Sequence, residues 1–279
     1  MQLDFQVENT IKTRSSIRTY EEKPLSKEDK NKLKEYMESS LVNPFSVNVL
    51  FRLLEQKNAV NGEKLGTYGV IKGAIDFIGA TVENSELALE ALGYSFEKLV
   101  LYATSIGLGT CFLGGTFNRS SFAAAMEVKE NELFPVISPV GYPFGKKRVK
   151  ESIMRWAIKA DKRKEWDELF FNEDFSSPLT KKDAGKYAFP LEMLRLAPSA
   201  ANKQPWRVVQ DKNGYHFYEL KTIGDSNKID IQRVDIGIAA CNFHMAAVGK
   251  DLSGRFEKLN TTKLETPDNL KYIFSWIIK

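Results

Sequence analysis

The sequence has few of the residues that build disulfide frameworks, metal centres and histidine-dependent active sites. It contains two cysteines, Cys111 and Cys241, and two histidines among 279 residues. Neither cysteine has partners at a spacing typical of metal ligands, so the sequence predicts no metal site. Both are more typical of small packed residues than of nucleophiles. We therefore expect no side chain to serve as an essential nucleophile, acid or base.

Long apolar runs and a strong charge imbalance are also absent. No stretch approaches the roughly 20 apolar residues that a membrane-spanning helix needs, and the polar N-terminus lacks a signal-peptide pattern. The 40 Lys and Arg residues nearly balance the 36 Asp and Glu residues, and they are scattered rather than gathered into a patch suited to nucleic acid. These absences predict a cytoplasmic protein that binds small molecules and neither membranes nor nucleic acids.

The most informative stretch that is present is Pro198-Ser-Ala-Ala-Asn-Lys-Gln-Pro-Trp-Arg207. Ser199, Asn202 and Gln204 offer hydroxyl and amide groups that donate and accept hydrogen bonds, as a planar heterocycle requires. Pro198 and Pro205 restrict φ at both ends, which favours a stiff loop. Composition alone is also typical of an ordinary polar loop before a strand.

Short matches separated by 154 positions indicate an internal duplication, although matches of this length also arise by chance. Pro24-Leu-Ser-Lys-Glu-Asp29 corresponds to Pro178-Leu-Thr-Lys-Lys-Asp183, and both are typical of helix starts with an N-cap hydroxyl at the third position. Pro44-Phe-Ser-Val-Asn48 corresponds to Pro198-Ser-Ala-Ala-Asn202. A duplicated unit of about 150 residues has the size of an ordinary domain.

The two predicted halves, residues 1–160 and 161–279, differ where a ligand would bind. Half one carries Arg14 and Arg18, whose counterparts in half two are Glu168 and Asn172. Conversely, Ser199 and Gln204 of half two correspond to Phe45 and Leu50. Because each half has what the other lacks, we expect one composite site per chain.

Hydrophobic periodicity and turn residues predict helices and strands without a regular strand–helix–strand repeat. This mixture favours an α+β fold, with a mixed β-sheet flanked by helices. We expect an amphipathic helix over Ser95–Ile106 and a charged linking segment over Glu151–Asp183. The other expected helices are Val7–Lys12, one after Ser26, one ending over Leu191–Leu196, and Asp235–Val248; the expected strands are Val47–Glu55, Ala74–Thr81, Phe134–Val140, Arg207–Gln210, Tyr215–Leu220 and Lys271–Ile278.

Two further segments are rich in glycine or basic residues. Gly107–Gly115 contains four glycines, which allow close backbone approach to a ligand. It is not a dinucleotide fingerprint, because it follows a predicted helix rather than a strand. Gly141-Tyr-Pro is followed by Gly145-Lys-Lys-Arg148, which is typical of an anion site or of an ordinary basic loop.

In order along the chain, Arg14–Arg18, Gly107–Gly115, Gly141–Arg148 and Pro198–Trp206 resemble the nitroreductase family of FMN-dependent oxidoreductases. The resemblance is strongest to the branch in which two nitroreductase-like halves are fused in one chain, and it spans nearly the whole sequence. It implies an internally duplicated pseudo-dimer, in which half two takes the place of a second subunit. The chain is then expected to be a monomer or a weak homodimer.

The resemblance also implies roles for individual residues. Arg14, with Ser15 and Ser16, would hold the FMN phosphate and ribityl oxygens, because guanidinium groups bind phosphate through paired hydrogen bonds. Arg18 would lie near the N1–C2=O edge of the ring and stabilise reduced flavin. The other residues implied to bind the cofactor are Leu113, Gly114 through its backbone N–H near N5, Gly115, Lys146, Arg148, Pro198, Ser199, Ala200, Asn202 and Gln204.

The expected activity is an FMN-dependent oxidoreductase that uses NADH or NADPH as reductant. Hydride would pass through flavin N5 to a nitroaromatic, a quinone or a similar acceptor, with the cofactor rather than a side chain carrying the chemistry. One alternative is a protein that binds FMN for storage or sensing without turnover. Another is a nucleotide-binding transferase, although no phosphate-binding loop follows a strand.

Overall fold

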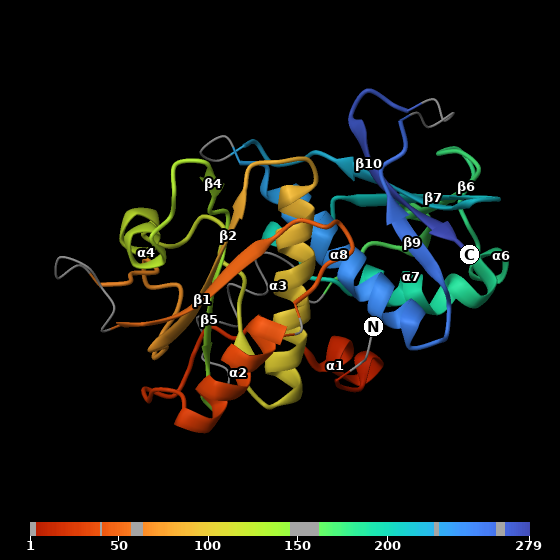
Figure 1. Ribbon diagram of the computed structural model, residues 1–279. Helices are drawn as coiled ribbons and strands as arrows, with labels where there is room; N and C mark the ends of the chain where they lie inside the picture. The colour runs from red at the N-terminus through yellow and green to blue at the C-terminus, as the bar shows by residue number, and fades with distance from the viewer. Residues whose placement is uncertain (1–3, 40, 57–63, 146–161, 226–228, 261–265) are drawn as a thin grey trace.

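The computed structural model describes residues 4–39, 41–56, 64–145, 162–225, 229–260 and 266–279. Within these ranges the chain forms two five-stranded sheets with helices between them (Figure 1). In chain order the elements are α1 (Val7–Thr13), α2 (Lys27–Ser39), β1 (Val49–Glu55), β2 (Asp76–Glu83), α3 (Ala88–Ser105), β3 (Gly109–Thr110), α4 (Arg119–Met126), β4 (Glu132–Leu133), β5 (Ile137–Gly141), η3 (Trp166–Glu168), β6 (Phe170–Asn172), α6 (Lys181–Ala184), η4 (Gly185–Tyr187), α7 (Ala188–Arg195), η5 (Ala200–Asn202), β7 (Trp206–Asp211), β8 (Gly214–Leu220), α8 (Ile231–Val248), β9 (Gly254–Glu257) and β10 (Leu270–Ile278).

The two sheets share one topology. The first contains the order β1-β2-β5-β3, and the second contains the order β7-β8-β10-β9. In each of these orders, the first two strands pair antiparallel and are followed along the chain by an 18-residue helix. The last strand along the chain lies between the second strand and an edge strand, and it is antiparallel to both. This repeated order supports the two-half organisation, while the boundary between residues 160 and 161 stays a prediction.

The corresponding helix starts of the two halves are both capped as predicted. The N–H of Asp29 donates to Ser26 Oγ at 3.0 Å, and the N–H of Asp183 donates to Thr180 Oγ1 at 3.1 Å. Each hydroxyl also donates to the carboxylate of the same aspartate, at 2.8 and 2.5 Å. A side-chain acceptor at the N-cap satisfies an N–H group that has no partner within the helix.

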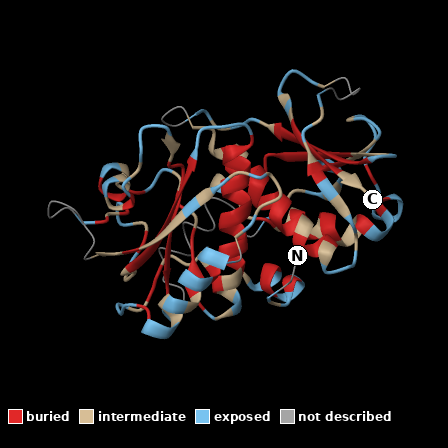
Figure 2. Ribbon diagram, viewed as in Figure 1, coloured by how far each residue is buried: buried red, intermediate tan, exposed pale blue. Residues whose placement is uncertain are grey.

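Helices α3 and α8 cross at the centre of the molecule, where nearly all of their residues are buried (Figure 2). A Cβ atom at Gly93 would lie 2.1 Å from the carbonyl oxygen of Val234, and one at Gly237 would lie 2.0 Å from that of Glu90. Gly93 and Gly237 are 144 residues apart, and so are Glu90 and Val234, so the two contacts are equivalent. The halves therefore meet through a pseudo-symmetric, backbone-to-backbone helix contact.

Helix α3 differs from the predicted amphipathic helix over Ser95–Ile106. It begins seven residues earlier, at Ala88, and all residues from Ala88 to Leu101 are buried. The reason is its place between the first sheet and α8, which covers the polar side chains as well. One of them, Glu90, forms an ion pair with Arg233 of α8 through Nε–Oε1 and Nη2–Oε2 distances of 2.6 and 2.8 Å.

The segment expected only to link the halves, Glu151–Asp183, contributes to the second sheet. Within its described part, β6 pairs in parallel with β7, so this sheet is mixed. A strand of three residues is too short to show a clear alternation of apolar and polar residues in the sequence. The other expected helices and strands are present with shifted ends, and the predicted hairpin is formed by β7 and β8.

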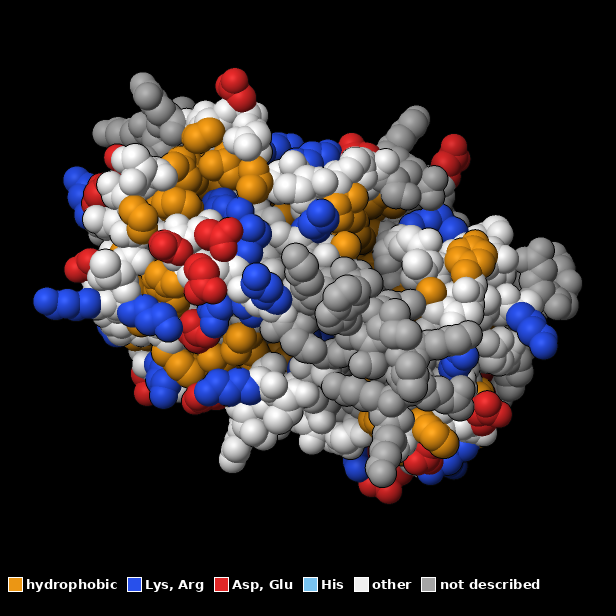
Figure 3. Space-filling model, turned by 180° about the vertical axis from the view of Figure 1, so that it is seen from behind, with side chains coloured by type: hydrophobic (Ala, Val, Ile, Leu, Met, Phe, Trp, Pro, Cys, Tyr) orange, Lys and Arg blue, Asp and Glu red, His pale blue; other side chains and the backbone are white. Residues whose placement is uncertain are grey.

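One hydrophobic core passes through both halves, and a smaller cluster lies under α4 on the outer face of the first sheet. No described helix is both long and apolar enough to cross a membrane. On the face in Figure 3, the described Lys and Arg side chains are interspersed with Asp and Glu side chains. That part of the surface forms no continuous basic patch.

Candidate functional site

A cavity of about 520 Å³ lies where the two halves meet. Its walls come from α1 and the segment after it, from the glycine-rich segment, from the loop before β7, and from the first part of α8. The volume is in the range of small-molecule and cofactor sites. The predicted site residues that line it are Arg14, Ser15, Ser16 and Arg18, with Gly114, of half one and Pro198, Ser199, Ala200 and Asn202 of half two.

The cationic segment is held against the first sheet by its backbone. The N–H of Arg14 donates to Thr10 O at 2.9 Å, which ends α1, and the N–H of Ile17 donates to Thr110 O of β3 at 2.8 Å. The Ile17 side chain packs against the smaller hydrophobic cluster. Since side chains alternate along an extended segment, its neighbours Ser16 and Arg18 line the cavity.

Arg18 brings hydrogen-bond donors that lack acceptors into the cavity wall. Its Nε and Nη1 atoms are buried and have no hydrogen-bond partner within the described part of the chain. A buried donor without an acceptor costs free energy, more so when it is charged. A ligand with an acceptor atom or a negative charge at this place would remove this cost.

The polar loop has an unusual backbone. Ala201, Asn202 and Gln204 have positive φ values of 48°, 55° and 50°. The left-handed conformation costs about 1–2 kcal/mol for each non-glycine residue. Such a loop persists only where the surrounding structure holds it, and strained segments of this kind cluster at ligand sites.

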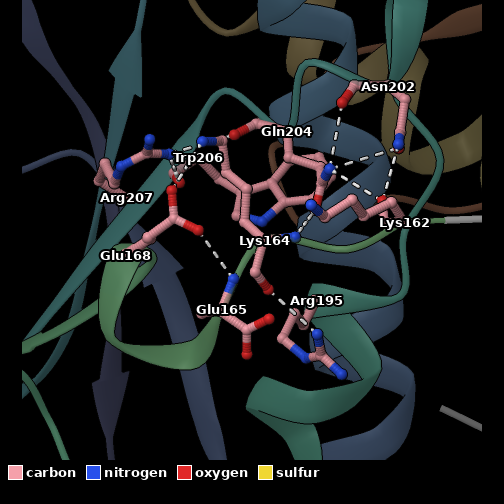
Figure 4. Close-up of polar contacts among 9 residues, drawn as sticks. All are labelled: Lys162, Lys164, Glu165, Glu168, Arg195, Asn202, Gln204, Trp206 and Arg207. Carbon is pink, nitrogen blue, oxygen red and sulfur yellow. Dashed lines mark hydrogen bonds and ion pairs between the residues drawn. The ribbon is translucent and has the colours of Figure 1, made fainter. Parts of the chain in front are cut away.

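Gln204 supports the loop instead of lining the cavity (Figure 4). It is buried, and its N–H donates to Ser199 Oγ at 2.9 Å. Its side-chain Oε1 accepts the N–H of Lys164 at 2.8 Å, and its Nε2 donates to Asn202 O at 3.1 Å. Asn202 in turn donates through Nδ2 to Lys162 O at 2.7 Å. Besides the two prolines, these hydrogen bonds hold the loop in place.

Two other predicted site residues also lie away from the cavity wall. Leu113 is buried and exchanges backbone hydrogen bonds with Ile137 at 2.9 and 3.1 Å. Gly115 is exposed to solvent. The predicted anion-binding pair, Lys146 and Arg148, lies outside the described residues.

The cavity wall contains residues that the sequence did not single out. Arg163 donates to Leu196 O at 3.1 Å and to Asn202 Oδ1 at 3.3 Å, which places it beside the polar loop. No sequence pattern marked Arg163 as a site residue, because its segment contains many charged residues. The other unpredicted lining residues are Ile11, Lys12, Phe112, Val136, Glu192, Leu196, Ala201, Ile231, Val234, Asp235 and Ile238.

Asp235 is an acidic residue within an apolar run of α8, a pattern that could have marked it, since charged residues are rarely buried without a partner. It is 3% exposed, and the N–H of Ala200 lies 3.1 Å from each of its carboxyl oxygens. Burial raises the pKa of this carboxyl well above its usual range, and Asp230 and Glu219 add to the effect against the opposing Ala200 hydrogen bond. This carboxyl therefore holds its proton more tightly than an exposed aspartic acid does.

The position that corresponds to the polar loop in half one is filled. Phe45, the counterpart of Ser199, has ring centroids 6.1, 5.4 and 5.1 Å from those of Tyr94, Phe256 and Phe274. It therefore belongs to an aromatic part of the core and offers no polar group to a ligand. This packing supports the expectation of a single site per chain.

Comparison with known proteins gives a match along most of the chain. The family model described as "Putative TM nitroreductase" matches residues 6–247. The crystal structure of a "putative nitroreductase" from Thermotoga maritima is similar over 100% of this chain and 96% of that chain, with 18% identity and a TM-score of 0.62. No curated protein matches the chain.

Other solved structures match about half of this chain. An FMN-dependent nitroreductase from Clostridium difficile matches 50% of this chain and 88% of its own, with 18% identity and a TM-score of 0.41. A nitroreductase with bound FMN from Bacteroides fragilis matches 52% of this chain and 94% of its own, with 19% identity and a TM-score of 0.40.

The family match includes segments of both halves, and the Thermotoga structure shares the fold from end to end. The predicted nitroreductase-like α+β fold is thereby confirmed, with one sheet in each half and the central helices between them. The chain belongs to the nitroreductase family that this model describes.

Proposed function

We propose that the protein is an FMN-dependent oxidoreductase that takes hydride from NADH or NADPH and reduces a nitroaromatic, a quinone or a similar acceptor. One observation carries the proposal: a single cavity joins the cationic segment of half one to the polar loop of half two, and Arg18 brings buried donors without protein acceptors into its wall. Membership of a nitroreductase family supports the same class of reaction.

In this proposal, Arg14 holds the cofactor phosphate, assisted by Ser15 and Ser16, and Lys146 and Arg148 add positive charge for the same phosphate. The donors of Arg18 serve the N1–C2=O edge of the ring, where a cation stabilises negative charge. Bound FMN supplies the hydride chemistry. The chain supplies placement, charge and a wall of apolar side chains from Phe112, Ile231, Val234 and Ile238 against which a planar ring can lie.

The complementary halves also lead us to propose that the chain works as a monomer or weak homodimer. Helices α3 and α8 bury each other within one chain and bring both sets of lining residues to one cavity. No second copy is needed to complete the site.

The direct test uses the purified full chain, titrated with FMN and then mixed with NADH or NADPH and 1,4-benzoquinone. We expect a bound-flavin absorption spectrum, bleaching of that spectrum by at least one of the two nucleotides, and quinone-dependent oxidation of the nucleotide. Binding of FMN without bleaching would support a storage or sensing protein instead. Failure to bind FMN would overturn the proposal.

A further inference from the structure

The cavity wall contains two carboxyl groups within the described residues, and they have different surroundings. Glu192 lies beside Arg195, with Nη2–Oε1 and Nε–Oε2 distances of 2.7 and 3.0 Å. Burial opposes its ionisation, but Arg195 and Lys181 outweigh burial and lower the pKa of Glu192. This group is therefore a carboxylate held in an ion pair.

Asp235 has no such partner. Its two oxygens share the single N–H of Ala200, and no described Lys, Arg or His side chain lies within ion-pair distance. A buried carboxylate needs a cation or several donors to stay ionised. With one N–H for two oxygens, the surroundings favour the neutral acid, whose O–H group can serve a ligand in the cavity.

Asp235 is also specific to half two. The 144-residue offset that relates Gly93 to Gly237 places Ala91 of α3 at the position equivalent to Asp235. Ala91 is fully buried and has no polar side-chain atom. The acid is thus present only in the helix whose N-terminal part lines the cavity, as expected for a group with a role there.

We propose that Asp235 is the proton donor to the electron acceptor in this cavity; the proposal rests on the proposed function. A quinone that receives hydride becomes a hydroquinone anion, with negative charge on an oxygen. The O–H bond of Asp235 breaks as an O–H bond forms on that oxygen, giving the neutral hydroquinone and a carboxylate. Water then returns a proton to the carboxylate, while the two electrons come from the reduced nicotinamide nucleotide.

The charged groups around Asp235 suit this role. Asp230 and Glu219 increase its affinity for a proton before the transfer. Lys12, Arg14, Arg18 and Arg163 line the same cavity, together with the ion-paired Glu192.

The first arm of the test uses the protein without FMN. Infrared spectra in H₂O and D₂O should show a protonated carboxyl band near neutral pH that is lost in Asp235→Asn, in which the amide oxygen still accepts the Ala200 N–H. Glu219→Gln is the matched control, because burial also raises the pKa of Glu219, to about 7, yet Glu219 does not line the cavity. It should leave the Asp235 band in place. If the spectrum of Asp235→Asn keeps every protonated carboxyl band of the parent, the proposal is overturned.

The second arm uses rapid mixing of the FMN-loaded protein. Asp235→Asn should still bind FMN and be reduced by the nucleotide, but reoxidation by 1,4-benzoquinone should slow about a hundredfold more than flavin reduction does, with loss of the solvent isotope effect. Glu219→Gln removes only the smallest of the effects on the proton affinity of Asp235, so both rates should stay close to those of the parent. Reoxidation of Asp235→Asn at the parent rate would overturn the proton-donor role. Failure of the nucleotide to reduce the parent would refute the proposed function instead, independently of the infrared result.

Discussion

Arg233→Leu is expected to lower the free energy of unfolding at neutral pH by about 3–5 kcal/mol, because it leaves a buried carboxylate without its cation. Glu90 is fully buried between the two halves, and Arg233 is its ion-pair partner, at 2.6 Å from Nε to Oε1. Burial already raises the pKa of Glu90 against the opposing effect of Arg233. Urea denaturation of the parent and the variant measures the difference.

The loss of stability in Arg233→Leu should depend on pH in a definite direction. Once Arg233 is removed, the folded-state pKa of Glu90 lies further above its ordinary value of 4.5, so folding favours the protonated form. The deficit should therefore be largest at neutral pH and shrink as the pH falls toward that ordinary value. The double variant Glu90→Leu/Arg233→Leu removes both charges and should recover most of the lost stability. A single variant as stable as the parent at neutral pH would show that the pair does not hold the halves together.

Arg14→Ala is expected to weaken FMN binding roughly ten- to a hundredfold, since a charge-assisted hydrogen bond to a phosphate contributes about 1.5–3 kcal/mol. Ser199→Ala should have a smaller effect, because a neutral hydrogen bond contributes about 1 kcal/mol. Ser199 Oγ also accepts the N–H of Gln204, and the loss of that bond acts on the loop rather than directly on the cofactor. Fluorescence titration of FMN with each variant measures the two affinities.

Arg14→Lys is the matched control, since it keeps the charge but loses the paired donors of guanidinium. Its affinity should fall between those of the parent and Arg14→Ala. If Arg14→Ala binds FMN as tightly as the parent does, the phosphate assignment is wrong. Lys146 and Arg148 would then have to hold the anion.

Local signals in the sequence predicted local structure well. The caps at Ser26 and Thr180 depend on one hydroxyl and one aspartate three residues later, and both formed as expected. The hairpin at β7 and β8 likewise needs only its own turn and alternating strands. The joining of Arg14 and Arg18 to the polar loop was predictable because the two halves carry complementary residues at one offset.

Features that depend on distant packing were not predictable in this way. The extent and burial of α3 follow from its position between a sheet and α8, and its own residues do not reveal that position. Gln204 looked like a ligand contact because its amide is polar, yet the backbone at Lys164 uses that amide. Asp235 stands out as an acid within an apolar run, but its place at the cavity wall depends on how α8 packs.

The most direct test of the account is the amount of flavin bound by each chain. FMN released by denaturing the saturated protein, divided by the protein concentration, should approach one per chain, and sedimentation should show that a monomer carries it. We expect this ratio because both halves line one cavity. The position in half one that corresponds to Ser199 is filled by Phe45, which packs in the aromatic core. Two FMN per chain, or FMN held only by an obligate dimer, would contradict a single composite site.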